Sequence, residues 1–332
     1  MRRLAIALCP IVALALFCVA SCSRRDPNLH PDHVVRAVSM GERIYVLSPT
    51  PGGTRLYVSR DARGGEAQMM TLRAQDYAVL DSFPCGVLPL GMLFLPNGKY
   101  LYVADDPYLD NLGKVWAVDV AESRVVKEIP TNRDPGPLAA SPDSRFLYVG
   151  SWAGDEVLVV RTEDNVVVDT IGFPHPAVAV AVSPDGSRLY VSAGKIYVLR
   201  TSDYAVIDSI AVGECAGELA ILPGGRRLYA SAVGDSGLVY AVNIPGNTVE
   251  DSVVIGRRVE EVCALPGGRF VYTSSPDDSL VCVIRTSDDS VIDRIPVGCV
   301  PSRLTAHPDG SRVYVLGPYY HLSAYQFVVL GY

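Results

Sequence analysis

One phrase recurs seven times along the chain and limits what it can fold into. Each copy is a Pro-Asp-Gly or Pro-Gly-Gly type of turn followed by Leu-Tyr-Val or a close relative, at spacings of 39 to 46 residues. The turns begin at Pro51, Pro96, Pro142, Pro184, Pro223, Pro266 and Pro308, and the aromatics that follow are Tyr57, Tyr102, Tyr148, Tyr190, Tyr229, Tyr272 and Tyr314. A regular repeat of this length without a helical pattern is typical of a propeller blade. The sequence therefore predicts an all-β, seven-bladed β-propeller.

The fourth repeat shows the pattern of one blade. Its Pro184-Asp185-Gly186 turn combines a residue with a preset backbone and one that accepts a positive φ. Apolar and β-branched runs on both sides predict four strands, at Ala179 to Ser183, Arg188 to Ser192, Ile196 to Arg200 and Ala205 to Val212. Short turns between them predict an antiparallel four-stranded blade.

Closure of the ring is the next question, because the last repeat starts near Ser302 and holds sequence for only about three strands. A strand-like segment from His33 to Met40 precedes the first complete repeat. We expect it to complete the last blade by pairing with the C-terminal strand, which would remove two free edges. The alternative is a fourth strand made by Phe327 to Tyr332.

The N-terminus has the pattern of an export signal. Arg2-Arg3 precede an uncharged apolar stretch from Leu4 to Ala20. The sequence Val19-Ala20-Ser21-Cys22 resembles a bacterial lipobox, which implies a lipid on Cys22 and a protein anchored to the cell envelope, on its periplasmic or surface face. An ordinary cleaved signal peptide is the alternative. We expect a signal over residues 1 to 21, a tether over 22 to 32 and the propeller over 33 to 332.

The charge of the chain argues against nucleic-acid binding, and its cysteines argue against a disulfide framework. Cleavage after Ser21 removes Arg2, Arg3 and no acid, so the formal net charge changes from -7 to -9, which does not favour nucleic-acid binding. Five cysteines would remain, at positions 85, 215, 263, 282 and 299. Cys263 and Cys282 are expected on strands that are not neighbours, about 9.5 Å apart, too far for a disulfide. We expect mostly free thiols, with a disulfide in the rim loops as the alternative.

Charged residues eight positions apart recur on the third and fourth strands of the blades. The pairs are Arg73 with Asp81, Arg161 with Asp169, Arg200 with Asp208 and Arg285 with Asp293, and the signs are exchanged in Asp119 with Lys127. Exchange of sign within one chain favours cross-strand pairing over a ring that recognises one ligand charge. We predict cross-strand ion pairs on the outer hairpins that carry these residues, whereas the fifth blade has Asn243 with Asp251 at the same spacing.

Strand direction divides the loops between two rims. The Pro-turn rim holds the connections between first and second and between third and fourth strands, and its loops are uniform. The variable rim holds the other connections, where function on a rigid scaffold is usually found. Its candidate binding residues are Asp105, Asp106, Asp110, Asn111, Trp152, Tyr319, Tyr320 and His321. The acidic group suits calcium or plain solvation, and the aromatics suit stacking on a ligand or on neighbouring blades. No spacing of metal ligands is present, so we expect no metal and no cofactor.

Three charged residues occupy equivalent positions, five residues before the Pro turn, in neighbouring blades. They are Glu218, Glu261 and Arg303, where the inner strand enters the channel. Two carboxylates beside a guanidinium suit an acid-base pair with an anion clamp. A salt-bridged plug of the channel mouth is the alternative. They are the weak catalytic candidates of this chain, since no Ser-His-Asp order or phosphate-binding glycine loop is present.

The run from Pro184 to Val191, with Val206-Ile207-Asp208 and Val212-Gly213, resembles the YVTN-type β-propeller repeat, as do Pro96 to Val103 and Pro308 to Val315. The resemblance extends from about residue 41 onward and implies an extracytoplasmic envelope protein. The Thr-Asn that usually follows Tyr-Val is replaced in each repeat, and no catalytic set carries over. We expect a monomeric, non-catalytic lipoprotein that presents a rim to a protein, glycan or small ligand. A lactonase-like hydrolase or isomerase and an accessory subunit of a periplasmic redox enzyme are the alternatives.

Overall fold

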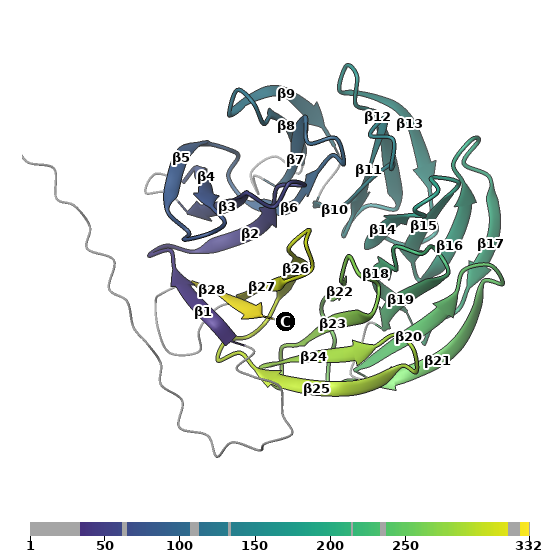
Figure 1. Ribbon diagram of the computed structural model, residues 1–332. Coiled ribbons are helices and arrows are strands. Elements are labelled where there is room, and N and C mark those ends of the chain that lie inside the picture. Colours follow the sequence, from purple (N-terminus) through teal and green to yellow (C-terminus); the bar gives the residue numbers. More distant parts are fainter. Residues whose placement is uncertain are drawn as a thin grey trace, which may run out of the picture. The chain divides into compact units, whose positions relative to one another are not determined.

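The computed structural model describes residues 34–61, 65–106, 113–131, 134–213, 215–232, 237–317 and 326–331. These residues form seven antiparallel sheets of four strands each, arranged around an axis (Figure 1). The inner strands contact one another in chain order, and the last of them contacts the first. The prediction of a seven-bladed, all-β propeller is confirmed. No helix long and apolar enough to cross a membrane is found in the part of the chain that is described.

Each blade runs from an inner strand to an outer edge strand. Blade 1 consists of β2 (Ile44–Pro49), β3 (Arg55–Asp61), β4 (Ala67–Arg73) and β5 (Val79–Pro84). Blade 2 consists of β6 (Pro89–Phe94), β7 (Tyr100–Asp105), β8 (Lys114–Asp119) and β9 (Arg124–Pro130). Blade 3 consists of β10 (Pro135–Ala140), β11 (Phe146–Ser151), β12 (Glu156–Arg161) and β13 (Val166–Gly172). Blade 4 consists of β14 (Ala179–Val182), β15 (Arg188–Ala193), β16 (Lys195–Arg200) and β17 (Val206–Ile210).

The remaining blades follow the same order except at the closure. Blade 5 consists of β18 (Ala216–Ile221), β19 (Arg227–Ala232), β20 (Leu238–Asn243) and β21 (Thr248–Val254). Blade 6 consists of β22 (Val262–Ala264), β23 (Phe270–Ser275), β24 (Leu280–Arg285) and β25 (Ser290–Pro296). Blade 7 consists of β26 (Arg303–Ala306), β27 (Arg312–Gly317), β28 (Gln326–Gly331) and, from the other end of the chain, β1 (Val34–Ser39).

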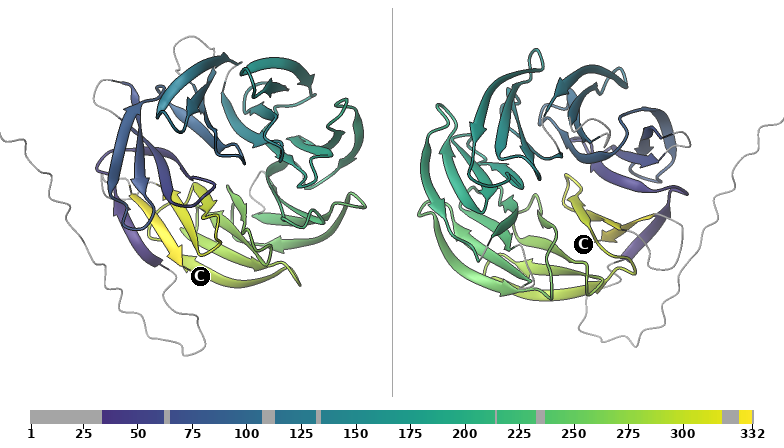
Figure 2. Two further views of the ribbon diagram at one scale, coloured as in Figure 1. Left: turned by 45° about the horizontal axis from the view of Figure 1, so that its top comes forward. Right: turned by 180° about the vertical axis from the view of Figure 1, so that it is seen from behind.

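The predicted closing strand forms as expected. β1 pairs antiparallel with β28, with Val38 opposite Phe327 and Ala37 opposite Val328. β28 is therefore the third strand of blade 7, and the alternative in which this segment is the fourth strand is wrong. The two ends of the propeller lie side by side in one sheet, in purple and yellow (Figure 2).

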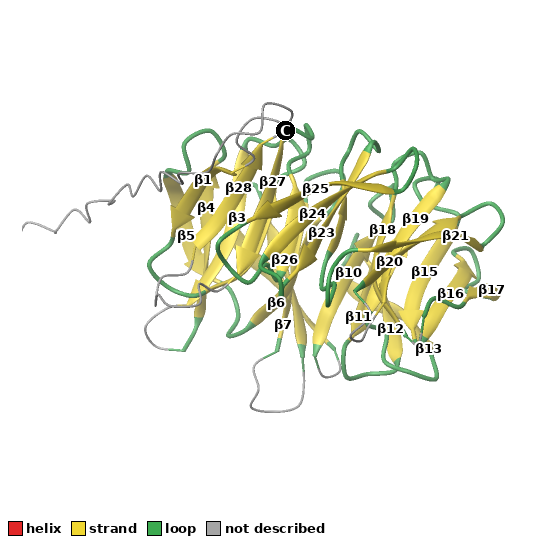
Figure 3. Cartoon of the chain, turned by 90° about the horizontal axis from the view of Figure 1, so that it is seen from below, coloured by secondary structure: helices red, strands yellow, loops and turns green. Residues whose placement is uncertain are grey.

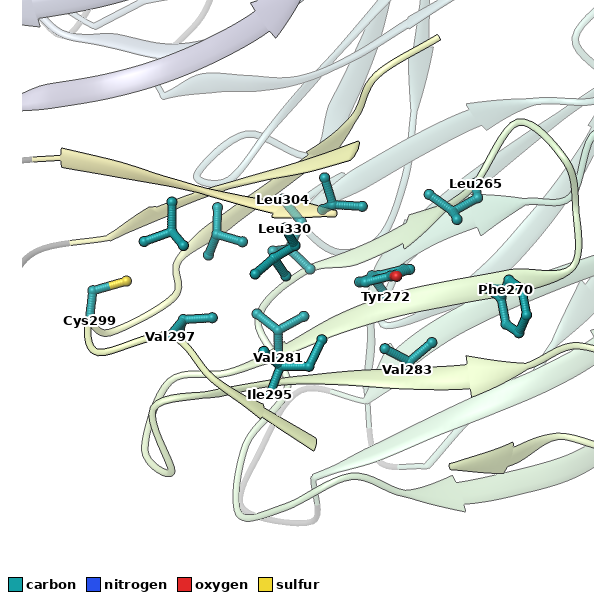
Figure 4. Close-up of a cluster of buried hydrophobic side chains, with 13 residues drawn as sticks. Leu265, Phe270, Tyr272, Val281, Val283, Ile295, Val297, Cys299, Leu304 and Leu330 are labelled. Carbon is teal, nitrogen blue, oxygen red and sulfur yellow. The ribbon is translucent and has the colours of Figure 1, made fainter. Parts of the chain in front are cut away.

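Apolar faces between neighbouring blades form the core. Between blades 6 and 7, Val281 and Ile295 pack against Leu304 and Leu330 (Figure 4). Six similar clusters fill the other interfaces, so no single central core exists. Burial of aliphatic side chains at about 25 cal/mol per Å² is the main source of stability for such an arrangement.

The tyrosines of the repeated phrase link each blade to the next near the Pro-turn rim. All seven are buried, at most 2% exposed. Tyr102 donates to the Asn165 side chain at 2.5 Å, and Tyr229 donates to the Asp289 side chain at 2.5 Å, each partner being in the following blade. Tyr148 contacts Tyr204 of blade 4 edge to face. The recurrence of Tyr therefore has a structural cause.

The predicted cross-strand ion pairs are wrong. Each arginine pairs instead with an aspartate three positions later in its own turn, as Arg161 does with Asp164 at 2.6 Å. The other such pairs are Arg73 with Asp76, Arg200 with Asp203 and Arg285 with Asp288. A register shift in the hairpin places Asp169 opposite Val159. The Asp169 carboxylate then accepts the N–H of Thr170 at 2.8 Å. All four turn pairs are about half exposed, which limits their effect on stability.

The described loops lie at the two ends of the strands, on the two rims of the propeller (Figure 3). Both connections that we assigned to the Pro-turn rim, at Thr50 to Arg55 and Arg73 to Ala78, are short hydrogen-bonded turns in blade 1. Residues 107–112, between β7 and β8, and residues 318–325, between β27 and β28, lie outside the described ranges. The assignment of loops to two rims therefore agrees with the strand order.

Candidate functional site

The channel mouth on the variable rim is asymmetric in its chemistry. Around the axis, the position five residues before each Pro turn is occupied by Val46, Gly91, Pro137, Ala179, Glu218, Glu261 and Arg303. Blades 1 to 4 supply small or apolar residues there, whereas blades 5 to 7 supply three charges. The structure brings these three charges to one cavity, as their shared register position predicts.

Serines on the second strands hold both glutamates in place. In blade 5, the register of β18 against β19 shifts between Ala216 and Leu219, which takes Glu218 out of the regular ladder. Its backbone N–H donates instead to the Ser231 hydroxyl at 2.9 Å. In blade 6, the Glu261 N–H donates in the same way to Ser274 at 2.9 Å. The hydroxyls satisfy backbone donors that the irregular strands leave unpaired. The backbone of each glutamate is therefore held in a fixed position.

Arg303 connects blade 7 to the opposite side of the mouth. Its Nη1 lies 3.4 Å from Glu261 Oε2, and its Nη2 donates to the carbonyl of Leu90 in blade 2 at 3.1 Å. Its guanidinium carbon lies 5.2 Å from the centre of the Trp152 ring. A cation is thus held by a carboxylate, a carbonyl and an aromatic face, although the ion pair is longer than a strong charge-assisted hydrogen bond.

Two glycines let Trp152 cover the mouth. A Cβ on Gly136 would lie 2.4 Å from the Trp152 ring, and a Cβ on Gly91 would lie 2.0 Å from the carbonyl oxygen of Gly136. Only glycine allows β6, β10 and the indole to approach this closely. Trp152 was predicted as a rim residue, but its contact with Arg303 was not predicted.

The mouth encloses a polar cavity. Its volume is about 180 Å³, and its polar lining comes from Ser48, Glu218, Glu261, Arg303 and Thr305. A second cavity of about 220 Å³ shares Trp152 and Glu218 with it and is also lined by Arg258 and Glu260. Arg303 and Glu261 do form an ion pair, as a plug requires, but space remains beside it.

Burial changes the proton affinity of both carboxyl groups. Burial raises the pKa of Glu218 to about 7, with Arg303 opposing the rise. Burial and the neighbouring Glu218 raise the pKa of Glu261 to about 8, again against the effect of Arg303. Two carboxylates with one guanidinium would leave one uncompensated negative charge. The pair therefore retains a proton near neutral pH.

The acidic candidates of the variable rim are only partly described. Asp105 is 1% exposed, and one of its carboxylate oxygens accepts the N–H groups of Val87 at 2.9 Å and Leu88 at 2.6 Å. The other oxygen accepts the Trp116 indole N–H at 3.1 Å. Asp105 thus fastens the loop between β5 and β6, and Asp106 is buried beside it. The remaining candidates, Asp110, Asn111, Tyr319, Tyr320 and His321, lie outside the described residues, as does Cys22.

All five cysteines of the propeller are free thiols, which confirms the prediction for Cys263 and Cys282 and leaves no disulfide in the rim loops. Cys263 lies next to the site on β22. Its pKa is raised to about 12 by burial and by the Glu261 carboxylate, so it is a protonated thiol at neutral pH and a poor nucleophile. Within the described ranges, no group of three or more His, Cys, Asp or Glu side chains could hold a metal ion.

Comparisons with known proteins define the class of this chain. No protein-family model matches it. It resembles the β-propeller domain of Cps50 (Swd1) from Myceliophteria thermophila, with a TM-score of 0.78 at 13% identity over 91% of this chain and 100% of that one. It also resembles the hydrazine synthase of Kuenenia stuttgartiensis, with a TM-score of 0.72 at 18% identity over 92% and 99% of the two chains. Such low identities show the fold alone: the protein is a seven-bladed β-propeller.

One curated relative is similar in sequence over a short region. A stretch of 107 residues is 27% identical to a 6-phosphogluconolactonase of Enterobacter sp. (strain 638), which is 31% of this chain and 32% of that protein. The match thus spans about a third of the relative's length.

Proposed function

We propose that this propeller is an exported binding protein whose small-ligand site is the channel mouth. The observation that carries the proposal is the cavity of about 180 Å³ at the one place in the inner ring where charged residues replace small ones. An engineered apolar cavity of about 150 Å³ binds benzene, so this volume suits a small organic molecule. Convergent polar groups beside an aromatic ring are the usual lining of a ligand site.

The test is equilibrium dialysis of the propeller against a small-molecule extract of its source cells, with enrichment read by mass spectrometry. The wild-type protein should concentrate at least one compound, and Trp152→Ala and Glu218→Gln should both lose it. Glu163→Gln serves as the control, because Glu163 is an exposed glutamate in the turn between β12 and β13 on the Pro-turn rim. Equal enrichment by all four proteins would place binding elsewhere and refute the proposal.

Export with a lipid anchor at Cys22 is the second part of the proposal. It is supported by the apolar segment after Arg2-Arg3 and by the lipobox-like Val19-Ala20-Ser21-Cys22. Cells grown with a labelled fatty acid should label the wild-type protein, and Cys22→Ala should abolish the label. Unchanged labelling of Cys22→Ala would refute the anchor at this position without affecting the ligand site.

A lactone hydrolase is a second candidate, favoured by the short match to 6-phosphogluconolactonase. In this function the Glu218 and Glu261 pair would supply a general base and a proton donor, and Arg303 would bind the lactone carbonyl or an anionic group. A pH-stat assay with 6-phosphogluconolactone distinguishes the two functions. Turnover that disappears in Glu261→Gln supports the hydrolase, and hydrolysis at the uncatalysed rate leaves the binding function.

A further inference from the structure

Among the charged residues of the channel mouth, Glu218 is the one whose carboxylate has no hydrogen-bond or ion-pair partner in the described part of the chain. Its half-buried side chain lines both cavities, and within the described residues no hydrogen bond or ion pair reaches its carboxylate. The groups that face it are Glu261, Arg303 and Glu260. Arg303 already contacts Glu261, the Leu90 carbonyl and Trp152. The Arg258 guanidinium, which lines the second cavity, pairs with Glu260 at 3.3 Å and Asp277 at 3.6 Å.

We propose that the ligand of the channel mouth is a small primary ammonium ion whose N–H groups donate to the Glu218 carboxylate. This inference rests on the proposed binding function and adds the chemical class of the ligand. An ammonium group has three donors and no acceptor, so it matches a carboxylate, the Ser48 and Thr305 hydroxyls and exposed carbonyls. The organic part of the ligand would fill the space lined by Leu90, Met92 and Leu138.

The position of Arg303 supports this ligand class. The mouth already holds one cation by a carboxylate, a carbonyl and an indole ring, which are the groups that recognise organic cations. With Glu218 and Glu261 both ionised, a second positive charge would neutralise the site. An anion would meet two carboxylates and an arginine that already donates to Glu261 and to the Leu90 carbonyl. The mouth is also a poor calcium site. Calcium takes six or more oxygen ligands, whereas the charged groups here are two carboxylates and a guanidinium.

A proton occupies this place when the ligand is absent, so binding and proton release are coupled. The cation favours the ionised carboxylate, whereas burial favours the neutral acid. Affinity should therefore fall as the pH drops below the Glu218 pKa of about 7, by up to about tenfold per pH unit. Primary alkylamines, which resemble the lysine side chain with its pKa of about 10.4, stay charged over this range.

The experiment is isothermal titration calorimetry of the whole propeller with cyclohexylamine and with cyclohexanol, two molecules of nearly equal shape, at pH 8 and pH 6. We expect the amine to bind at pH 8 at least about tenfold more tightly than the alcohol and more weakly at pH 6. Glu218→Gln should lose about tenfold or more in amine affinity, Glu218→Asp should keep part of it, and Glu163→Gln should match the wild type. Thermal melts of each variant show that it is folded.

The remaining outcomes show whether only the ammonium class of the ligand is wrong or the binding function as well. If cyclohexanol binds as tightly as cyclohexylamine and Trp152→Ala weakens both, the ammonium class is wrong but the mouth is still the ligand site. The same conclusion follows if the amine binds equally to wild type and Glu218→Gln. If neither molecule binds, the ammonium class is wrong. If no compound is enriched in dialysis either, the binding function falls with it.

Discussion

The Pro-turn rim and the channel mouth are built from the same seven repeats, yet they follow opposite rules. On the Pro-turn rim, turn geometry and buried tyrosines recur from blade to blade, as in the links from Tyr102 to Asn165 and from Tyr229 to Asp289. At the mouth, the equivalent positions change from Gly91 and Ala179 to Glu218 and Glu261. Repetition therefore marks the residues that hold the scaffold together, and departure from the repeat marks the residues with a chemistry of their own.

Irregularity at the mouth still depends on tight packing. Gly91, Gly136 and Trp152 are in close contact, and the Leu90 carbonyl beside them accepts from Arg303. The mouth is therefore a fixed site that the scaffold positions, and the two regions should respond differently to the same substitution.

Adding one methyl group at a glycine should change the free energy of unfolding far more at the channel mouth than on the Pro-turn rim. Gly91→Ala would place a Cβ 2.0 Å from the Gly136 carbonyl oxygen, whereas Gly52→Ala in a Pro turn meets nothing within 4 Å. We expect Gly91→Ala to lower the free energy of unfolding by about 3 kcal/mol and Gly52→Ala to leave it nearly unchanged. Urea denaturation measures both. A Gly91→Ala protein as stable as Gly52→Ala would show that the mouth is loosely packed.

Removing a tyrosine hydroxyl tests whether the repeated aromatics act through their hydrogen bonds. The hydroxyl of Tyr229 donates to Asp289, whereas that of Tyr57 is buried without a partner among the described residues. Tyr229→Phe should cost about 1 to 3 kcal/mol, and Tyr57→Phe should be neutral or slightly stabilising. Equal losses in thermal and urea unfolding would show that the hydrogen bond to Asp289 does not account for the role of the repeated tyrosines.

The pH dependence of stability tests the charged mouth. The folded-state pKa values of Glu218 and Glu261, about 7 and about 8, lie above the ordinary value of 4.5. Between pH 4.5 and 8 the folded protein thus binds more protons than the unfolded chain, and these groups make stability fall as pH rises. Glu218→Gln should match the wild type at pH 5 and exceed it by about 1 kcal/mol at pH 8. A variant that loses the same stability at both pH values would contradict the raised pKa.

The smallest effect is expected for the ion pairs of the turns. Asp288→Asn breaks the pair with Arg285, whose side chains are 48% and 47% exposed. Solvent screens such a pair, so the melting temperature should stay within experimental error in both low and high salt. A salt-dependent loss would mean that these turns contribute more to the scaffold than their exposure indicates.

The sequence was sufficient to predict the fold because every repeat combines a turn signal with strand alternation. The closing strand followed from the missing fourth strand of the last repeat. Cross-strand pairing of Arg161 with Asp169 failed because the turn of the hairpin pairs Arg161 with Val166, which leaves Asp169 opposite Val159, two positions before Arg161. Local turn chemistry then provided Asp164 as the nearer partner.

The candidate site was predictable only where the repeat fixes a register. Glu218, Glu261 and Arg303 share one position in neighbouring blades, so their convergence could be inferred before the structure. The stacking of Trp152 on Arg303 and the role of Leu90 depend on loop paths and on contacts across the channel. Gly91 and Gly136 were the missed signals, since glycine within an inner strand indicates close approach of another group.

A crystal structure of the propeller grown with cyclohexylamine at pH 8 tests the central claim most directly. We predict ligand density in the channel-mouth cavity, with the amine nitrogen at about 3 Å from the Glu218 carboxylate and the ring near Leu90 and Met92. Density on the Pro-turn rim or against the outer strands, with the mouth free of the amine, would contradict the assignment of function to the irregular end of the propeller.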